Sequence, residues 1–229
     1  NLRNANLPKM RLARSVLSHS DLSQADLNSA DLKEARIQDA NLYNADLSGA
    51  NLRGADLTRA YLGNAQLFYI FAPESNFSFA DLTGSILAGA NLQYSQFQSS
   101  ILKRVFFRFT DFRGARLDNA NLEGAYLGQV SLHGMVFQSV FLENASLKGA
   151  NLRGSNCGGT NFRGVNLQGA DLRGADLRSA DFSFANLLDA QLEGANLLGA
   201  NFQGALVDKP NQKVIDNSPN LKTLWQWRR

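Results

Sequence analysis

The 229-residue sequence has few of the residues that build most catalytic and metal sites. It contains one cysteine, two histidines and four prolines, and 19% of its residues are charged. One cysteine excludes an intramolecular disulfide framework, and no Cys/His cluster has the spacing of a metal site. No run of 18 apolar residues occurs, so we predict no membrane-spanning helix. The formal net charge of +3 is spread along the chain, unlike the concentrated basic surface of a nucleic-acid-binding domain.

What the sequence has instead is a large apolar residue at every fifth position. From Leu2 to Val207 this frame runs through 42 pentads without an insertion, and 30 of the 42 centres are Leu and 8 are Phe. Two positions before each centre lies a small residue, which is Ala at 25 of the 41 such positions from Ala5 to Ala205. The chain is therefore a tandem array rather than an ordinary globular sequence.

A period of five fits neither a long helix nor a continuous strand. On an α-helix each pentad would advance the stripe by about 140°, so the leucines would wind around every side. On a strand an odd period would alternate the leucines between the two faces. The apolar residues all face one interior only if each pentad is a short extended piece followed by a corner. The small residue and the centre of the pentad then point inward. Glycines such as Gly49, Gly54 and Gly149 recur at the turning position, and we therefore predict a solenoid.

Several pentads carry the same five-letter motif. Ala50–Gly54 and Ala150–Gly154 both read Ala-Asn-Leu-Arg-Gly, and Ala170–Gly174 reads Ala-Asp-Leu-Arg-Gly. These pentads resemble the pentapeptide-repeat family, whose pattern is Ala-(Asn/Asp)-Leu-x-x. The resemblance implies an all-β solenoid, a right-handed quadrilateral β-helix with four pentads and twenty residues per coil. On this basis we expect one β-helix of about ten coils over residues 1–207.

The frame stops after Val207, and we expect residues 208–229 to form a C-terminal cap. Asp208-Lys209-Pro210 is interpreted as the break that ends the pentad frame. Ser218 followed by Pro219 is typical of a helix start, so we predict a short amphipathic α-helix over 219–228. Its apolar side would carry Leu221, Leu224 and Trp225. The expected role is to plug the last coil, and the alternative is a homodimer contact through Trp225 and Trp227.

The pentad frame argues against catalysis. His19 and His133 would lie more than five coils apart, so they cannot share a site on a rigid rod. Cys157 occupies a pentad centre, where we expect a buried and inert thiol. Carboxylates that precede a centre, such as Asp171 and Asp176, are expected to accept hydrogen bonds from the corner backbone as in Asx turns. We therefore predict that the protein is not an enzyme and needs no cofactor, metal or small-molecule substrate.

One outward column of the expected coil is rich in arginine. This arginine ladder consists of Arg53, Arg113, Arg153 and Arg173. Asp111 and Asp171 lie in the adjoining column, so we interpret the ladder as a solvated face that neutralises itself. The alternative is a ladder that faces an anionic partner.

The middle of the rod carries apolar residues at outward positions. We name as the apolar patch Phe68, Tyr69, Phe71, Ile86, Phe106, Phe109 and Tyr126. A contiguous apolar surface usually marks contact with another molecule. The competing interpretation is a bulky surface that a very stable rod tolerates.

These observations favour a non-enzymatic scaffold that binds a protein partner through the apolar patch. The alternative, implied by the family resemblance, is protection of DNA gyrase from quinolones by members thought to imitate DNA with an acidic rod and to dimerise through a C-terminal helix. The charge of +3 and the lack of any frame-breaking loop depart from those members. A cytoplasmic location is expected. The frame already runs at Asn1 with no Met before it, so a longer protein or a removed targeting segment stays open.

Overall fold

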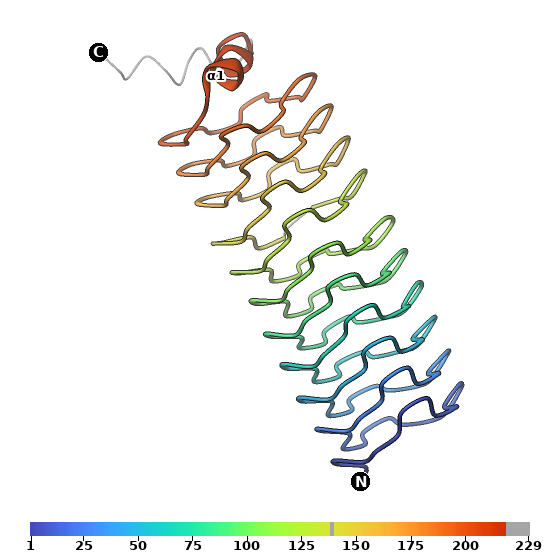
Figure 1. Cartoon of the computed structure of the whole chain (residues 1–229). Helices are drawn as coiled ribbons and strands as arrows, with labels where there is room; N and C mark the ends of the chain where they lie inside the picture. Colours follow the sequence, from blue (N-terminus) through green and yellow to red (C-terminus); the bar gives the residue numbers. More distant parts are fainter. Residues whose placement is uncertain (138–139, 219–229) are drawn as a thin grey trace.

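The computed structural model describes residues 1–137 and 140–218 and shows a rod of stacked coils (Figure 1). Parallel bridges join residues twenty positions apart, from Asn6 with Asp26 to Asn186 with Leu206. The chain thus returns to the same column after four pentads, which confirms the predicted twenty-residue coil. The bridges are isolated because each extended piece is only a few residues long between corners. The architecture is a β-helix-type solenoid.

The pentads turn through the same tight corner along the rod. The N–H of Ala5 donates to the C=O of Leu2 at 3.0 Å, and equivalent bonds recur from pentad to pentad. Just before Ala5, Asn4 has a φ of 57°, and Gly49 at the equivalent position of a later pentad has a φ of 68°. A type II turn requires this left-handed conformation at its third residue, and glycine adopts it without steric cost. The predicted turning position is confirmed.

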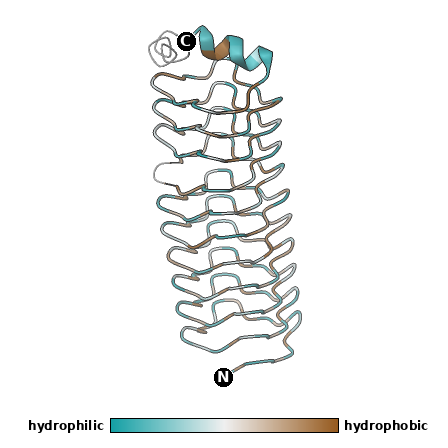
Figure 2. Ribbon diagram, turned by 90° about the vertical axis from the view of Figure 1, so that its left-hand side faces the viewer, coloured by the Kyte–Doolittle hydropathy of each residue, from teal (hydrophilic) through white to brown (hydrophobic). Residues whose placement is uncertain are grey.

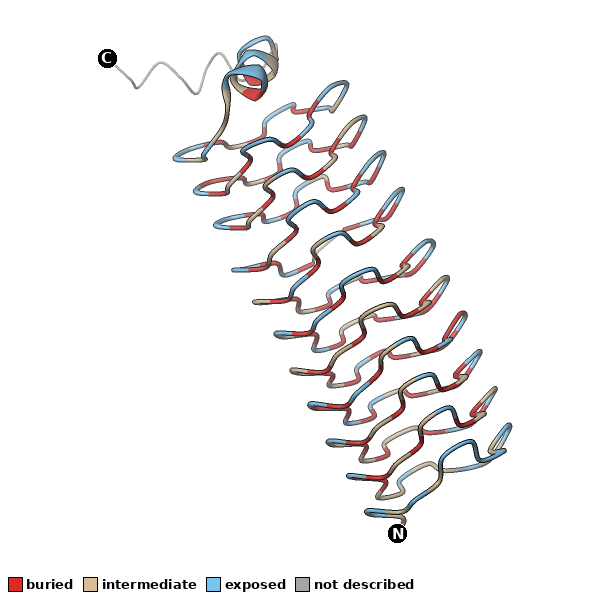
Figure 3. Ribbon diagram, viewed as in Figure 1, coloured by how far each residue is buried: buried red, intermediate tan, exposed pale blue. Residues whose placement is uncertain are grey.

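The centres and the small residues form one continuous core. Buried residues recur at the centres and small positions of the coils after the first, whereas residues 1–20 are intermediate or exposed (Figure 3). Leu52 and Leu92 are fully buried, as the pentad frame predicts. The rings of Phe162 and Phe182 stack with centroids 4.9 Å apart, and that of Phe202 follows 5.0 Å beyond Phe182. Each such side chain contributes about 1.5–3 kcal/mol on burial, so the interior ladders stabilise every coil through its neighbours.

Backbone hydrogen bonds tie each coil to the next, and side chains cap the corners. The N–H of Leu52 donates to the C=O of Phe71 at 2.7 Å, one coil further on. Asp171 accepts a hydrogen bond through Oδ1 from the N–H of Arg173 at 3.1 Å. The same pairing recurs at most Asn and Asp residues that precede a centre. The predicted Asx-turn role is confirmed, and hydrophilic and hydrophobic residues recur along the stacked coils (Figure 2).

The described residues contain one helix, α1 (Lys209–Asp216). Asp208 is its N-cap, and its Oδ1 accepts from the N–H of Asn211 at 2.9 Å. The pentad frame ends after Val207 as predicted, but the helix that starts at Lys209 was not predicted. Pro210 fits the first helical turn because that turn needs no N–H donor from it. The helix predicted over 219–228 lies outside the described residues.

Helix α1 lies across the C-terminal end of the rod (Figure 1). The side-chain amide of Asn211 is buried and donates to the C=O of Leu187 at 3.2 Å and of Ala190 at 2.9 Å. Ile215 is fully buried beneath the helix. These contacts satisfy carbonyls and cover apolar surface that the last coil would otherwise expose. With eight residues α1 is too short to cross a bilayer, and the described part of the chain offers no other candidate span.

Candidate protein-binding face

Five of the seven residues of the apolar patch are exposed on the rod. Tyr69 is 75% exposed, and Phe109 is 61% exposed. Phe71, Phe106 and Tyr126 are also exposed, whereas Phe68 and Ile86 are half-buried. Neither half-buried residue belongs to the core, because both lie at outward positions of the pentad. All seven predicted residues therefore contribute to the surface, five of them fully.

A column of three side chains forms the centre of the patch. Parallel bridges join Ile86 to Phe106 and Phe106 to Tyr126, so the three residues are neighbours on consecutive coils. The rings of Phe106 and Tyr126 stack with centroids 4.4 Å apart and an interplanar angle of 5°. Because residues twenty apart lie side by side on consecutive coils, the rings of Phe106 and Tyr126 form one contiguous aromatic surface. The corner that follows this column carries Phe68, Tyr69 and Phe109.

Glycine makes room for the aromatic residues at this corner. A side chain at Gly89 would collide with the ring of Tyr69, which lies over that position from the preceding coil. Phe109 is held differently, with the guanidinium carbon of Arg108 4.7 Å from its ring centroid, a cation–π contact. Phe71 lies on the next side of the rod, where parallel bridges pair it with polar residues in the flanking coils. It therefore borders the patch, and the corner carries the continuous part.

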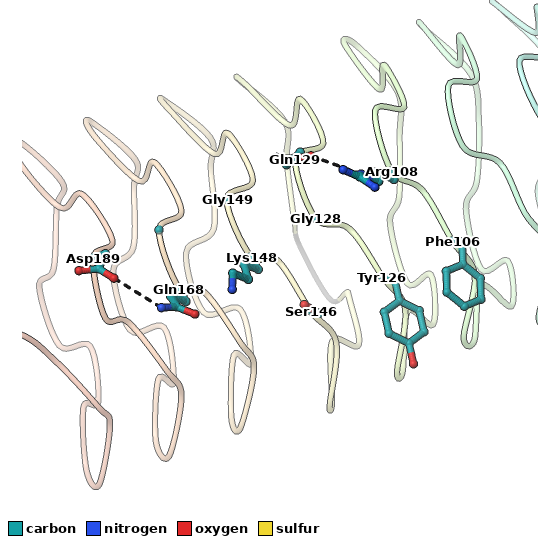
Figure 4. Close-up of a pocket in the computed structure, with 11 residues that line it drawn as sticks. Phe106, Arg108, Tyr126, Gly128, Gln129, Ser146, Lys148, Gly149, Gln168 and Asp189 are labelled. Atoms are coloured by element: carbon teal, nitrogen blue, oxygen red, sulfur yellow. Dashed lines mark hydrogen bonds between the residues drawn. The ribbon is translucent and has the colours of Figure 1, made fainter.

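A groove of about 590 Å³ opens beside the aromatic column, as Figure 4 shows. Its floor is low because Gly128, Gly149, Gly169 and Ser146 carry little or no side chain. Phe106, Arg108, Tyr126 and Gln129 line its N-terminal part. Lys148, Gln168 and Asp189 line its C-terminal part. Of these residues, only Phe106 and Tyr126 are among the predicted binding residues, and Gly149 was predicted as a turning residue alone.

Two hydrogen bonds close the ends of the groove. Nε of Arg108 donates to Oε1 of Gln129 at 3.4 Å, and Nε2 of Gln168 donates to Oδ2 of Asp189 at 3.5 Å. Lys148 lies between these two pairs (Figure 4), is exposed, and forms no ion pair with any described residue. The groove therefore presents a free cation between an aromatic wall and a carboxylate.

The four predicted arginines of the ladder differ in their partners. Arg53 pairs with Glu74 at 3.3 Å, Arg113 with Asp111 at 2.7 Å, and Arg173 with Asp171 at 2.7 Å. Arg153 forms no ion pair within residues 1–137 and 140–218. The guanidinium of Arg173 holds the pKa of the Asp171 carboxyl below its usual range. Three of the four arginines are thus neutralised by neighbouring carboxylates, in the manner of a solvated face.

The structure keeps the potentially reactive side chains apart. Cys157 is fully buried, and burial raises the pKa of its thiol to about 12. His19 lies 3.9 Å from Asp39. His133 lies more than five coils further along the rod and contacts the backbone oxygen of Arg153 in the next coil. Among the described residues, no three His, Cys, Asp or Glu side chains group as metal ligands would. The groove and the apolar patch are therefore the candidate binding surfaces of the described residues.

The fold and this face define a class, a repeat solenoid with a regular core and a variable outer surface. A family model for pentapeptide repeats matches the chain in eight copies that together cover residues 1–68 and 75–206. The chain belongs to the pentapeptide repeat family.

Two solved structures are similar to this chain. HetL, a protein involved in heterocyst differentiation regulation from the cyanobacterium Nostoc sp. strain PCC 7120, is 32% identical over 90% of this chain and 92% of its own, with a TM-score of 0.38. A trypsin-treated form of QnrB1, a plasmid-mediated fluoroquinolone resistance protein, is 20% identical over 72% of this chain and 92% of its own, with a TM-score of 0.53. The likeness to QnrB1 is one of fold. The comparison with curated proteins gives no match.

Proposed function

We propose that this protein is a non-enzymatic scaffold that binds a protein partner through the apolar patch. The observation that supports the proposal is the stacked column of Ile86, Phe106 and Tyr126 beside the exposed rings of Tyr69 and Phe109. Aromatic side chains on a rigid support are the usual anchors of protein interfaces, since they bury much area at little entropic cost. The patch is also contiguous, whereas scattered apolar residues need no partner.

The architecture that we propose for the scaffold is a right-handed quadrilateral β-helix of about ten coils over residues 1–207, with residues 208–229 as its cap. Such a rod holds the patch in one shape before binding, which lowers the ordering cost of an interface. A homodimer contact through the C-terminal cap stays a prediction, because Trp225 and Trp227 lie outside the described residues. A cytoplasmic location also stays a prediction, which cell fractionation would test.

The test of the patch is the double variant Phe106→Ser with Phe109→Ser. Both side chains point outward, so we expect a melting temperature within about 2 °C of the wild type and at least a tenfold loss of partner binding in pull-down. The matched control is Phe79→Ser with Tyr94→Ser, which removes two rings of similar exposure from other corners of the rod. Sedimentation of all three proteins separates loss of a partner from loss of self-association.

Two results would overturn this proposal. A double variant that melts much earlier than its control would mean that Phe106 and Phe109 act in the core. A double variant that melts normally and keeps every partner of the wild type would leave the patch without a binding role.

Protection of gyrase is the second candidate, supported by the fold that the chain shares with QnrB1. A DNA-like rod needs a continuous negative face, yet Asp111, Asp171 and Asp176 are each paired with an arginine two residues on. The net charge is also +3. A gyrase supercoiling assay with a fluoroquinolone decides the matter, since a protector restores supercoiling and a scaffold for another partner does not.

A further inference from the structure

We propose that the groove beside the aromatic column binds an extended segment of the partner that carries an apolar side chain, then a carboxylate, then a basic side chain. The proposal rests on the scaffold function above and names the chemistry of the partner. It follows from the length of the groove, from its low floor and from the order of its side chains.

The groove has the length of a short extended peptide. It runs from the coil that contains Phe106 to the coil that contains Asp189, which is four coils further on. At about 4.8 Å per coil this distance is roughly 19 Å. An extended chain advances about 3.3 Å per residue, so about six residues span the groove.

The glycine floor lets a peptide backbone approach the rod closely. A side chain at Gly169 would meet nothing within 4 Å, and one at Gly149 would meet only Cγ of Gln129, at 3.7 Å. The space over both corners is therefore open. Non-glycine residues occupy the same left-handed conformation elsewhere in the rod, including Gln24 and Gln129. The corner geometry thus tolerates side chains, and it is the groove that gains room from the glycines.

The side chains along the groove change character in a fixed order. Phe106 and Tyr126 offer an apolar wall at the N-terminal part, and Lys148 follows about two coils after Phe106. Asp189 lies about two coils beyond Lys148. Side chains on one face of an extended chain lie two residues, or about 6.6 Å, apart. A partner side chain between the two rings and a carboxylate at Lys148 fit this spacing. A long basic side chain two residues further on spans the rest of the distance to Asp189.

The same order argues for a peptide rather than a polyanion. A nucleic acid strand is bound by a positive track that follows its phosphates. Here the cationic part ends at Asp189, whose carboxylate would repel a phosphate at that point. A peptide with one acidic and one basic side chain satisfies both ends of the groove.

The probe for this proposal is the acetylated and amidated hexapeptide Phe-Ala-Glu-Ala-Lys-Ala, titrated into the full 229-residue chain labelled with ¹⁵N. We expect the amide signals of Gly128, Gly149 and Gly169 to shift with one dissociation constant. A peptide with Gln in place of Glu should bind more weakly, and the difference should shrink at high salt because the contact is ionic.

A charge swap tests the central contact. The variant Lys148→Glu should bind the hexapeptide at least tenfold more weakly, and a peptide with Lys in place of Glu should recover binding to this variant. Lys148 is exposed and unpaired among the described residues, so the variant should keep its fold. Recovery by the swapped peptide is an outcome that a merely damaged rod would not give.

Filling the groove tests its shape. Gly169→Gln places a side chain in the groove, and Gly164→Gln is the matched control, because its position also has a left-handed backbone and open space but lies at another corner. We expect the first variant to lose at least fivefold in affinity for the hexapeptide and the control to bind like the wild type.

Titrations that shift no groove glycine, or peptides that bind equally with Glu and Gln, would overturn the peptide proposal. If the variant Phe106→Ser with Phe109→Ser still loses its protein partner, the scaffold function stands without the peptide. If that variant keeps its partners while the hexapeptide shifts the groove glycines, the patch proposal falls and the groove proposal stands.

Discussion

The regular coils over residues 21–60 and the middle coils over 61–137 share one interior and differ on the outside. Leu42 in the first region and Leu127 in the second are both fully buried. The outward residue at the middle of a side is Asp46 in the regular coils, and it is Phe106 in the same column three coils later. The inward positions therefore build the rod, and the outward positions are free to differ.

The backbone explains why the two regions can differ outside without differing in fold. The N–H of Leu27 donates to the C=O of Asp46 at 2.7 Å, and the N–H of Leu87 donates to that of Phe106 at 2.8 Å. The outward side chain takes no part in this bond, so an aromatic ring replaces a carboxylate without breaking the ladder. A mutation should thus matter according to the direction of its side chain rather than its region.

The largest effect should come from a charge placed in the core. Leu122→Asp would bury a carboxylate without a partner at a fully buried centre, and we expect a loss of roughly 3–5 kcal/mol in unfolding free energy. Tyr126→Ser, outward in the same coil, should cost only about 1 kcal/mol, because it loses the stacking on Phe106. Chemical denaturation followed by circular dichroism measures both.

The same substitution in the other region sharpens the comparison. Leu52→Asp should cost as much as Leu122→Asp, since both centres are fully buried. A rod that tolerates one of these changes and not the other would show that the two regions do not share one interior.

A smaller effect is expected at the one core cysteine. Cys157→Ser is nearly isosteric, and Ser155 Oγ lies 3.2 Å from the sulfur, so the new hydroxyl has a partner. We expect a cost of about 1 kcal/mol. Because burial raises the pKa of the thiol to about 12, folded protein at pH 8 should not react with a polar alkylating reagent. Rapid alkylation without unfolding would contradict the buried position.

The smallest effect should be a pH dependence from the paired carboxylates. The hydrogen bond from Arg173 lowers the pKa of Asp171, and that from Arg178 lowers the pKa of Asp176. A carboxyl whose folded pKa is below its unfolded value adds stability that is present above about pH 4 and lost as pH falls through the folded pKa.

The double variant Arg173→Ala with Arg178→Ala measures that contribution. It should melt slightly below the wild type at about pH 6, and the difference should vanish as the pH falls through the lowered folded pKa values of the two carboxyls. Because the arginines are largely exposed, the effect should also fade with salt. A difference that persists at low pH and high salt would mean that the arginines stabilise by packing instead.

The sequence by itself determined the repeat, the inward leucines, the turning positions and the outward patch. The repeat and the turning positions are local to a pentad and recur along 42 pentads, so a single misread pentad changes nothing, and the patch follows from where its residues fall in that frame. The stacking of Phe106 on Tyr126 also followed once a twenty-residue coil was assumed, because residues twenty apart then share a column.

Only the tertiary structure decided the groove and the end of the rod. The groove depends on which side chains are missing in neighbouring coils, and Gly149 and Gly169 read along the chain as two more corner glycines. Helix α1 begins where Pro210 suggests a break, because Asp208 caps it and Asn211 bonds to carbonyls twenty-one and twenty-four residues away. Asn211 lies beyond the pentad frame, and the groove depends on which corners of neighbouring coils lack a side chain, so both become visible only when the coils are stacked.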